Sequence, residues 1–178
     1  GQGSSFFGGI DATSTSHTYV AGCLATFGQD ITLGDVTMLN SSFTNRFDTR
    51  WTQTFGATAN GGNITINNFT SALSPGKSVE FDIGNGTPNT VTFTGSVNST
   101  DKMYFKGAGA VDVQGDANLA GGVYAQKLAH ETNTTPSVDF NGNVTLTGAM
   151  EFEGNSVTFV NGVEAAGNDL TINFTQAT

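Results

Sequence analysis

The stretch that decides the fold of this chain reads Val138-Asp-Phe-Asn-Gly142, Asn143-Val-Thr-Leu-Thr-Gly148 and Ala149-Met-Glu-Phe-Glu-Gly154. Apolar residues alternate with polar ones, which places the apolar side chains on one face of a β-strand. Each unit ends in glycine, the residue that best tolerates sharp turns of the backbone. The alternation continues through residues 155–174. The stretch therefore predicts very short strands joined by tight corners.

The same unit, apolar-x-apolar-x-Gly, occurs six times in the chain, at residues 91–95, 103–107, 111–115, 138–142, 144–148 and 150–154. Between the third and fourth copies, residues 116–135 break the pattern. The spacing of their apolar residues favours a helical turn or a longer loop. The residues concerned are Leu119, Val123, Tyr124 and Leu128.

Gly142, Gly148 and Gly154 follow one another so closely that hairpin partners would be very short. A parallel solenoid suits this spacing better, because each short strand stacks on the equivalent strand one rung away. Three strands and their corners would give a rung of about 18 to 25 residues. The predicted fold is therefore all-β, a β-solenoid of the parallel β-helix type, with apolar ladders inside and polar ladders outside.

The alternative is a β-sandwich or jelly roll that a donated strand from a neighbouring subunit completes. It accounts better for the apolar N-terminal segment and the hydrophobic region 17–39, and less well for the glycine spacing. Both architectures leave strand edges open, and pairing between subunits would cover them in either.

The sequence divides into three regions. Residues 1–15 form an extended segment that could act as a donor strand, residues 16–61 form a β-rich region, and residues 62–178 carry the glycine-punctuated repeat. We expect the last two to make one continuous domain, although the β-rich region does not share the repeat.

Two parts of the β-rich region leave strand and helix in competition. Residues 17–27 could be a buried strand or a short helix, and their Thr, Tyr and Val content favours a strand. Residues 30–39 are expected beside it as strands broken by Gly34. Further on, aromatic residues recur every four positions, as in a helix, although threonine and aromatic content favours a strand there too. These aromatics are Phe43, Phe47, Trp51 and Phe55.

Composition excludes some partners and favours a location. Net charge is −9, and the six basic residues are scattered, so a nucleic-acid or anionic membrane surface is not expected to bind. Charged residues are 12% of the chain, about half the usual share, so Ser, Thr, Asn and Gly must keep it soluble. No stretch reaches the roughly 18 to 20 apolar residues of a membrane span. This composition is typical of secreted and cell-surface proteins.

Three stretches in residues 62–174 share one pattern of short strands and glycine or asparagine turns: Val91-Thr-Phe-Thr-Gly95-Ser-Val97, Ser156-Val-Thr-Phe-Val-Asn-Gly162 and Ala166-Gly-Asn-Asp-Leu-Thr-Ile-Asn173. On these residues, the region resembles the β-solenoid repeats of filamentous-haemagglutinin-like adhesins and autotransporter passengers. The resemblance implies a secreted right-handed β-helix used for surface display, adhesion or assembly. The chain departs from that family in its irregular repeat length and its lack of a barrel or secretion module, which favours a fibre subunit.

The leading hypothesis is a secreted, non-enzymatic structural subunit of an extracellular filament, pilus-like fibre or adhesive surface assembly. Subunits would polymerise with copies of themselves by β-strand pairing, and host or neighbouring cell surfaces or their glycans are further candidate partners. No cofactor and no metal is expected. The predicted assembly contacts lie near the two ends of the chain, at Phe6, Phe7, Ile10, Leu170, Ile172 and Phe174.

The glycosylation pattern Asn-x-Ser/Thr also suits an extracellular protein. In a chain rich in these residues some matches arise by chance, so they are candidates. They are Asn40, Asn63, Asn68, Asn85, Asn98, Asn133, Asn143 and Asn173.

The second hypothesis is a carbohydrate-binding or polysaccharide-cleaving β-helix. Trp51 and Tyr104 would be the stacking platforms, and Asp139, Glu151 and Glu153 the acids, because a carboxylate pair can hydrolyse glycosidic bonds at suitable separations. A solvated polar ladder is the more frequent role of such carboxylates.

Other chemistry has weaker signals. Residues 82–86 and 112–116 place carboxylates beside glycine turns without matching a calcium loop. His17 and Cys23 could form a nucleophilic pair if they met, but no family signature surrounds them. The single cysteine excludes an internal disulfide, and a buried thiol or an intermolecular disulfide remain its two roles.

Overall fold

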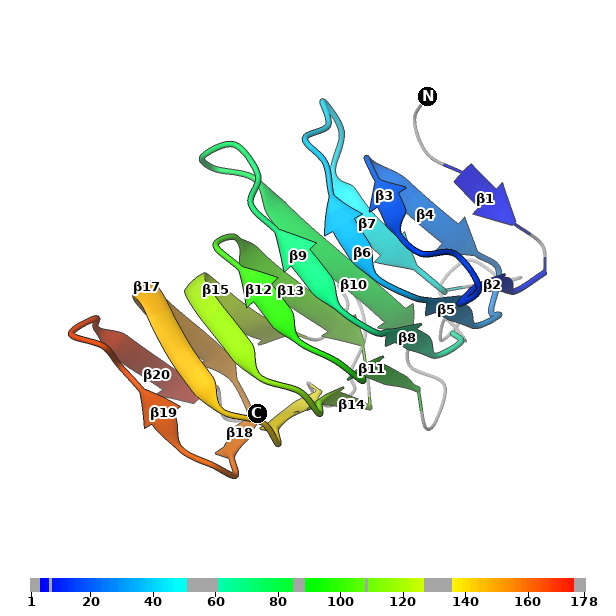
Figure 1. Cartoon of the computed structure of the whole chain (residues 1–178). Coiled ribbons are helices and arrows are strands. Elements are labelled where there is room, and N and C mark those ends of the chain that lie inside the picture. Colours follow the sequence, from blue (N-terminus) through cyan, green and yellow to red (C-terminus); the bar gives the residue numbers. More distant parts are fainter. Residues whose placement is uncertain are drawn as a thin grey trace.

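The structure is a computed structural model that describes residues 4–6, 8–50, 61–84, 89–107, 109–126 and 136–174. None of these residues forms a helix, and all regular structure is β. The chain winds as a β-solenoid of about 6 turns, with every strand pairing parallel. Figure 1 shows the strands side by side along one axis, from β1 at the N-terminal end to β19 and β20 at the other.

Three walls surround the core. The first wall is a 7-stranded sheet in the order β18-β16-β14-β11-β8-β5-β2. Its strands are β2 (Ile10–Ala12), β5 (Ile31–Leu33), β8 (Ile64–Ile66), β11 (Thr90–Phe93), β14 (Ala110–Val113), β16 (Ser137–Phe140) and β18 (Ser156–Phe159).

The second and third walls belong to one 13-stranded sheet, because β15 (Ala117–Gln126) and β17 (Val144–Gly154) run through both. The second wall also contains β3 (Thr18–Val20), β6 (Val36–Met38), β9 (Phe69–Ser71), β12 (Val97–Ser99) and β19 (Val163–Glu164). The third wall also contains β1 (Ser4–Phe6), β4 (Cys23–Thr26), β7 (Asn45–Asp48), β10 (Ser78–Gly84), β13 (Lys102–Gly107) and β20 (Leu170–Phe174).

The glycine-ended units of the predicted repeat contribute their apolar residues to the core. The two apolar residues of every glycine-ended unit are at most 3% exposed, and they stack on their equivalents in the next rung. In the third wall, Phe47, Phe81 and Phe105 form one such column with stacked rings. The sandwich alternative does not apply, because the parallel walls close around this core within one chain.

The prediction of a helical turn or loop in residues 116–135 is wrong for its first part. Residues 117–126 form the single strand β15. Leu119 points inward in the second wall and Val123 inward in the third, with Gly121 at positive φ between them. Leu119 and Val123 are therefore four residues apart because the residues between them form the corner from one wall to the next. Residues 127–135, including Leu128, lie outside the described part.

The N-terminal part of the chain also contributes rungs to the solenoid. The strands β5, β6 and β7 pair directly with β8, β9 and β10 across the boundary at residue 61. Residues 17–27 form strands rather than a short helix, residues 30–39 form two strands separated at Gly34 as predicted, and Phe47 lies in strand β7. Trp51 and Phe55 lie outside the described residues.

Rung length varies because of insertions at corners. Val138 pairs with Val157, and Val91 with Val111, so the rungs between them have the predicted length. By contrast, Ile31 pairs with Ile64, and the rung between these two residues is far longer than predicted. The strands of the longer rungs still stack on their equivalents in the neighbouring rungs.

The glycines at the corner between the first and second walls are needed for close approach rather than for positive φ. A Cβ on Gly115 or Gly142 would come within 3.0 Å of the backbone of the preceding rung. Neither residue has positive φ. At this corner, Asn and Asp side chains bridge successive rungs: Asn68 donates to Asp35 (2.9 Å) and Asn143 to Asp116 (3.0 Å). Glycine and short amide side chains thus let the rungs stack at the corner.

Candidate functional site

The C-terminal rung is an open end of the solenoid. Among the described strands, β18, β19 and β20 pair on one side only, with β16 and β17. Residues at core positions of this rung are therefore partly exposed. Phe174 is 62% exposed and Ile172 39%, while Phe159, Val163 and Leu170 are half-buried. An unpaired strand edge beside apolar side chains is a template for pairing with another chain.

The N-terminal rung is the opposite open end. β1, β2 and β3 pair only with β4, β5 and β6 among the described strands. Phe6 is 43% exposed, and Ile10 and Ala12 are half-buried. Beside β1 and β3 lies a hollow of about 250 Å³, whose lining includes Ser4, Val20 and Leu24.

The six predicted assembly residues do not form one site. Leu170, Ile172 and Phe174 lie together on β20, whereas Phe6 and Ile10 lie at the far end of the coil. Phe7 lies outside the described residues. The sequence prediction missed Ala12, Val157, Phe159 and Val163, which share the two end faces. Their period-two alternation could have indicated them, since each continues an inward ladder.

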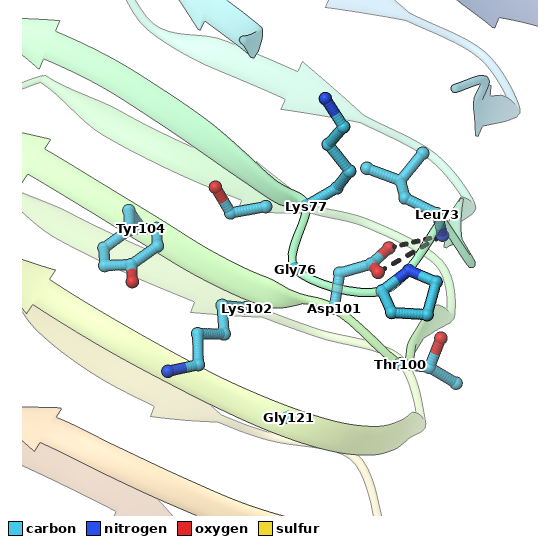
Figure 2. A pocket seen from close by; sticks show the side chains of 10 residues that line it. Leu73, Gly76, Lys77, Thr100, Asp101, Lys102, Tyr104 and Gly121 are labelled. Carbon is cyan, nitrogen blue, oxygen red and sulfur yellow. Dashed lines mark hydrogen bonds between the residues drawn. The ribbon is translucent and has the colours of Figure 1, made fainter. Parts of the chain in front are cut away.

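A groove crosses the corner between the second and third walls (Figure 2). It encloses about 590 Å³ between the loop of residues 72–77 and the rung that contains Thr100, Lys102 and Tyr104. Asp101 fixes the loop, because its carboxylate accepts hydrogen bonds from the backbone N–H of Leu73 (3.0 and 3.2 Å) and from the hydroxyl of Ser71. Asp101 is itself only 7% exposed. The groove is therefore shaped by a buried carboxylate.

Beside this groove, Tyr104 and Tyr124 stack along the outer face of the third wall. Their ring centroids are 4.8 Å apart, with Lys102 over Tyr124 and Lys106 over Tyr104. The Tyr124 hydroxyl donates to Glu151 (2.7 Å), and burial together with this bond raises the pKa of Tyr124. One face of Tyr104 is thus covered by another ring and Lys106 lies over the ring as well, which leaves its edge for a ligand.

The acids of the carbohydrate hypothesis lie on different walls. Glu151 and Glu153 project from β17 in the third wall, whereas Asp139 lies on β16 in the first wall, opposite Asp112 and Thr158. Trp51 lies outside the described residues. Asp139 therefore lies apart from the two glutamates with which the carbohydrate hypothesis groups it.

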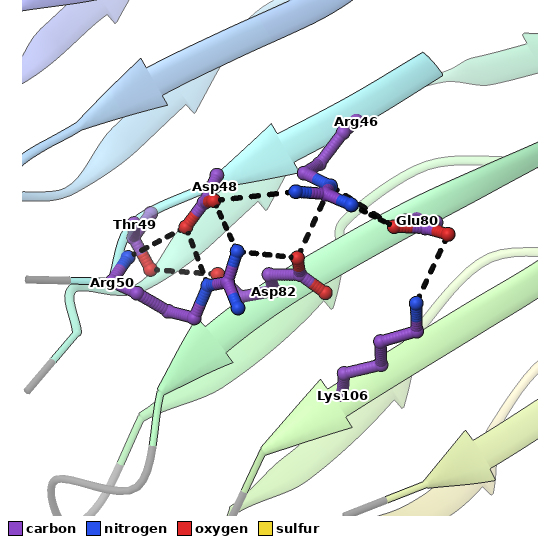
Figure 3. A network of polar contacts seen from close by, with 7 residues as sticks. All are labelled: Arg46, Asp48, Thr49, Arg50, Glu80, Asp82 and Lys106. Atoms are coloured by element: carbon purple, nitrogen blue, oxygen red, sulfur yellow. Dashed lines mark hydrogen bonds and ion pairs between the residues drawn. The ribbon is translucent and has the colours of Figure 1, made fainter. Parts of the chain in front are cut away.

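Six charged residues form a network over β7, β10 and β13 that the sequence reading missed (Figure 3). Asp82 is at its centre, with Oδ2 at 3.2 Å from Arg46 and 2.9 Å from Arg50. Glu80 pairs with Arg46 (2.7 Å) and Lys106 (3.0 Å). The residues come from three rungs that are far apart in sequence, so only the register of the rungs brings the opposite charges together.

Burial is the main influence on the pKa of the central carboxylate of this network. Asp82 is 1% exposed, and desolvation raises its pKa to about 6 in spite of Arg50 and Arg46. Its Oδ1 is buried and has no hydrogen-bond partner among the described residues. Hydrogen bonding to Asp48 raises the pKa of Arg50. The network pins the end of β7 to its neighbours, and its arrangement of paired charges has the character of a structural clamp.

The candidate glycosylation sites differ in how their side chains are used. Asn68, Asn143 and Asn173 each donate through Nδ2 to a carboxylate, of Asp35, Asp116 and Glu151. Asn40 is exposed and Asn63 is half-buried, and both use Oδ1 to accept from a backbone N–H. Asn98 is half-buried in an amide ladder with Asn118. Asn85 and Asn133 lie outside the described residues.

No described group of three or more His, Cys, Asp or Glu side chains is arranged to hold a metal ion. Asp82 is engaged by arginines, and the carboxylates of Asp112 and Asp116 accept hydrogen bonds from Asn141 and Asn143. A helix long and apolar enough to cross a membrane is likewise absent from the part of the chain that the structure describes.

His17 and Cys23 have separate surroundings. His17 bonds to Thr37 (2.8 Å) and packs on Tyr19, while Cys23 begins β4 beside Arg46. Burial raises the pKa of the Cys23 thiol, with Asp48 adding to the effect. A thiol with a raised pKa is a poor nucleophile at neutral pH.

Comparison with known proteins adds no family and no relative to the fold described above. No protein-family model matches the chain, and neither the curated proteins nor the solved structures contain a match.

Proposed function

We propose that this protein is a secreted, non-enzymatic structural subunit that polymerises with copies of itself, by β-strand pairing, into an extracellular filament or adhesive surface assembly. The observation that carries the proposal is the pair of open ends: among the described strands, those of both terminal rungs pair on one side only, and their core positions are partly exposed. Solenoids with such ends are soluble as monomers only when polar caps cover them.

Other features support the same proposal. From β5 and β6 to β11 and β12, the outward rows of the first two walls consist of Thr and Asn, a surface suited to repetition along a fibre. The resemblance of residues 62–174 to filamentous-haemagglutinin-like and autotransporter-passenger repeats points to surface display. In this structure residues 4–6 and 10–12 pair with β4 and β5 of their own chain. The proposal therefore uses the edges of whole rungs for assembly.

The test is negative-stain microscopy and sedimentation of the purified protein over a range of concentration and salt. Filaments are expected, with more assembly at higher salt, because each subunit carries a net charge of −9 and screening reduces the repulsion. Lysine protects strand edges in natural proteins, so Ile172→Lys with Phe174→Lys should give folded monomers. A wild-type protein that stays monomeric at high concentration and high salt would refute the proposal.

The groove in Figure 2 favours one alternative function, carbohydrate binding. Its volume suits a sugar unit or two, and its lining combines Leu73, Pro75 and Tyr104 with polar groups, as ligand sites usually do. Titration with a panel of neutral and acidic oligosaccharides, followed by backbone NMR shifts, tests it. Shifts at Thr100, Lys102 and Gly121 would support binding, and an unresponsive groove would exclude it.

A further inference from the structure

The columns of side chains inside the third wall end in a projecting ring at one end and a hollow at the other. Starting from the N-terminal end, one column runs through Ser4, Leu24, Phe47, Phe81 and Phe105. At the C-terminal end, Glu153 pairs with Tyr124, and Gly154 is the next residue in the same strand. Gly154 therefore continues the column, and Phe174 pairs with Gly154. Phe174 is thus a core position of the solenoid whose outer side meets no described strand, and 62% of its surface is exposed.

The N-terminal end of the same column offers space. Ser4, a small residue, takes the position where three later rungs have phenylalanine. The hollow of about 250 Å³ opens beside it, with Val20 and Leu24 in its lining. A ring placed one rung beyond Ser4 would lie over this hollow.

The first wall shows the same relation between its ends. There the two inward columns end at Val157 and Phe159, and begin at Ile10 and Ala12. Phe159 already stacks on Phe140 with ring centroids 5.3 Å apart. Stacked end to end, the large Phe159 would meet the small Ala12, and Val157 would meet Ile10. Alternating large and small residues across facing positions is how cores interdigitate.

We infer that the occupant of each end is a second copy of this chain, stacked head to tail and in register, with Phe174 of one copy seated in the Ser4–Val20–Leu24 hollow of the next. This inference rests on the proposed function and adds polarity and register to it. A head-to-tail contact of this kind does not close, so it propagates into a filament.

The outward rows are compatible with this register. Thr158 would lie beside Asp11 of the next copy, and Glu164 beside its Tyr19, so these two contacts across the junction bring no like charges together. Two C-terminal faces brought together would instead oppose exposed rings with no hollow to receive them. The polar and apolar rows thus favour the same polarity.

Disulfide cross-linking tests the polarity. In a Cys23→Ser background, Asp11→Cys combined with Thr158→Cys places two thiols on adjacent parallel strands, whose spacing of about 4.8 Å is within disulfide reach. Mild oxidation should give a ladder of dimers, trimers and longer products on a non-reducing gel. Either single variant should give no ladder. Covalent dimers from a single variant would show a symmetric contact and overturn the inference.

The role of the ring is tested by Phe174→Ala, with Phe43→Ala as matched control. Phe43 is 44% exposed and precedes β7, away from both end faces. Burying a phenylalanine ring is worth about 1.5–3 kcal/mol, so the critical concentration for assembly should rise about tenfold or more for Phe174→Ala. Phe43→Ala should leave it within about twofold.

The outcomes separate the two proposals. If the wild type forms filaments but Phe174→Ala leaves the critical concentration unchanged, the head-to-tail contact is overturned and the filament proposal stands. Wild-type filaments without a cross-linked ladder from the double-cysteine variant would have the same meaning. A wild-type protein that never assembles would overturn both. A folded Phe174→Ala variant, checked by circular dichroism, excludes loss of structure as the cause.

Discussion

Phe81 stacks on Phe105 with ring centroids 4.9 Å apart and ring planes inclined by only 15°, although the two residues belong to different rungs. Phe47 stacks on the other side of Phe81 at 5.2 Å. The middle ring of this column is 0% exposed. The column links three rungs, so its loss affects more than one.

Phe81→Ala should lower the free energy of unfolding by about 3–5 kcal/mol, because it removes a fully buried ring and leaves a cavity. Urea denaturation followed by circular dichroism measures the change. Val160→Ala is the control, since Val160 is 59% exposed in the turn after β18 and should change stability by less than about 0.5 kcal/mol. Equal effects of the two substitutions would contradict a stabilising column.

Gly142→Ala should destabilise the solenoid by about 1–3 kcal/mol, because its Cβ would collide with the backbone of Gly115 and Asp116 in the preceding rung. The thermal midpoint of unfolding is the readout. Gly8→Ala introduces the same methyl group where nothing lies within 4 Å, and should be neutral. A neutral Gly142→Ala would mean that the corner can open without cost.

Asp101→Ala should release the loop of residues 72–77, because the loop loses the carboxylate that accepts from Leu73 and Ser71. Leaving buried donors unsatisfied costs about 1–3 kcal/mol. Hydrogen exchange at the Leu73 amide should accelerate in this variant. Asp169→Ala, at an exposed position, serves as control. Unchanged exchange at Leu73 would show that the loop is held by other contacts.

Asp82 should make stability depend on pH in an unusual direction. Its pKa is about 6 in the folded state and near the ordinary 3.8 in the unfolded state, so between these values the folded protein binds more protons. The contribution of Asp82 to the free energy of unfolding therefore falls as pH rises from about 4 to 6, by on the order of 1 to 3 kcal/mol. The groups facing it are Arg46, Asp48, Arg50 and Lys106.

Asp82→Asn isolates this effect, because the amide cannot titrate. The stability of the wild type relative to Asp82→Asn, measured by urea denaturation, should decline over that pH window and level off above it. Parallel curves for the two proteins would show that Asp82 stays ionised throughout.

Glycan occupancy should differ among the acceptor sites when the protein is made in a glycosylating cell. A glycan on Asn143 would replace the Nδ2–H that bonds to Asp116, whereas Asn40 is exposed and uses only Oδ1 in its bond to Ser74. Glycopeptide mass spectrometry should find Asn40 more fully occupied than Asn143. The reverse order would show that the Asp116 bond does not form before modification.

Sequence pattern alone predicts the solenoid class, and the inward faces of the strands in the glycine-ended repeat. Apolar and polar residues alternate around Val138 and Phe140, and this alternation predicts that both side chains are buried. The prediction depends only on the local geometry of a strand. It also placed Phe174 and Ile172 among the residues of interest, because they continue the same alternation.

Features that depend on the register between rungs could be seen only in the folded chain. The pairing of Asp82 with Arg46 and Arg50, the groove under Asp101, and the separation of Asp139 from Glu151 all follow from which residues stack. Register depends on corner and insertion lengths, which vary from rung to rung and leave no periodic signal. The corner within β15 shows the same limit, because its four-residue spacing looks helical until the walls on either side of it are known.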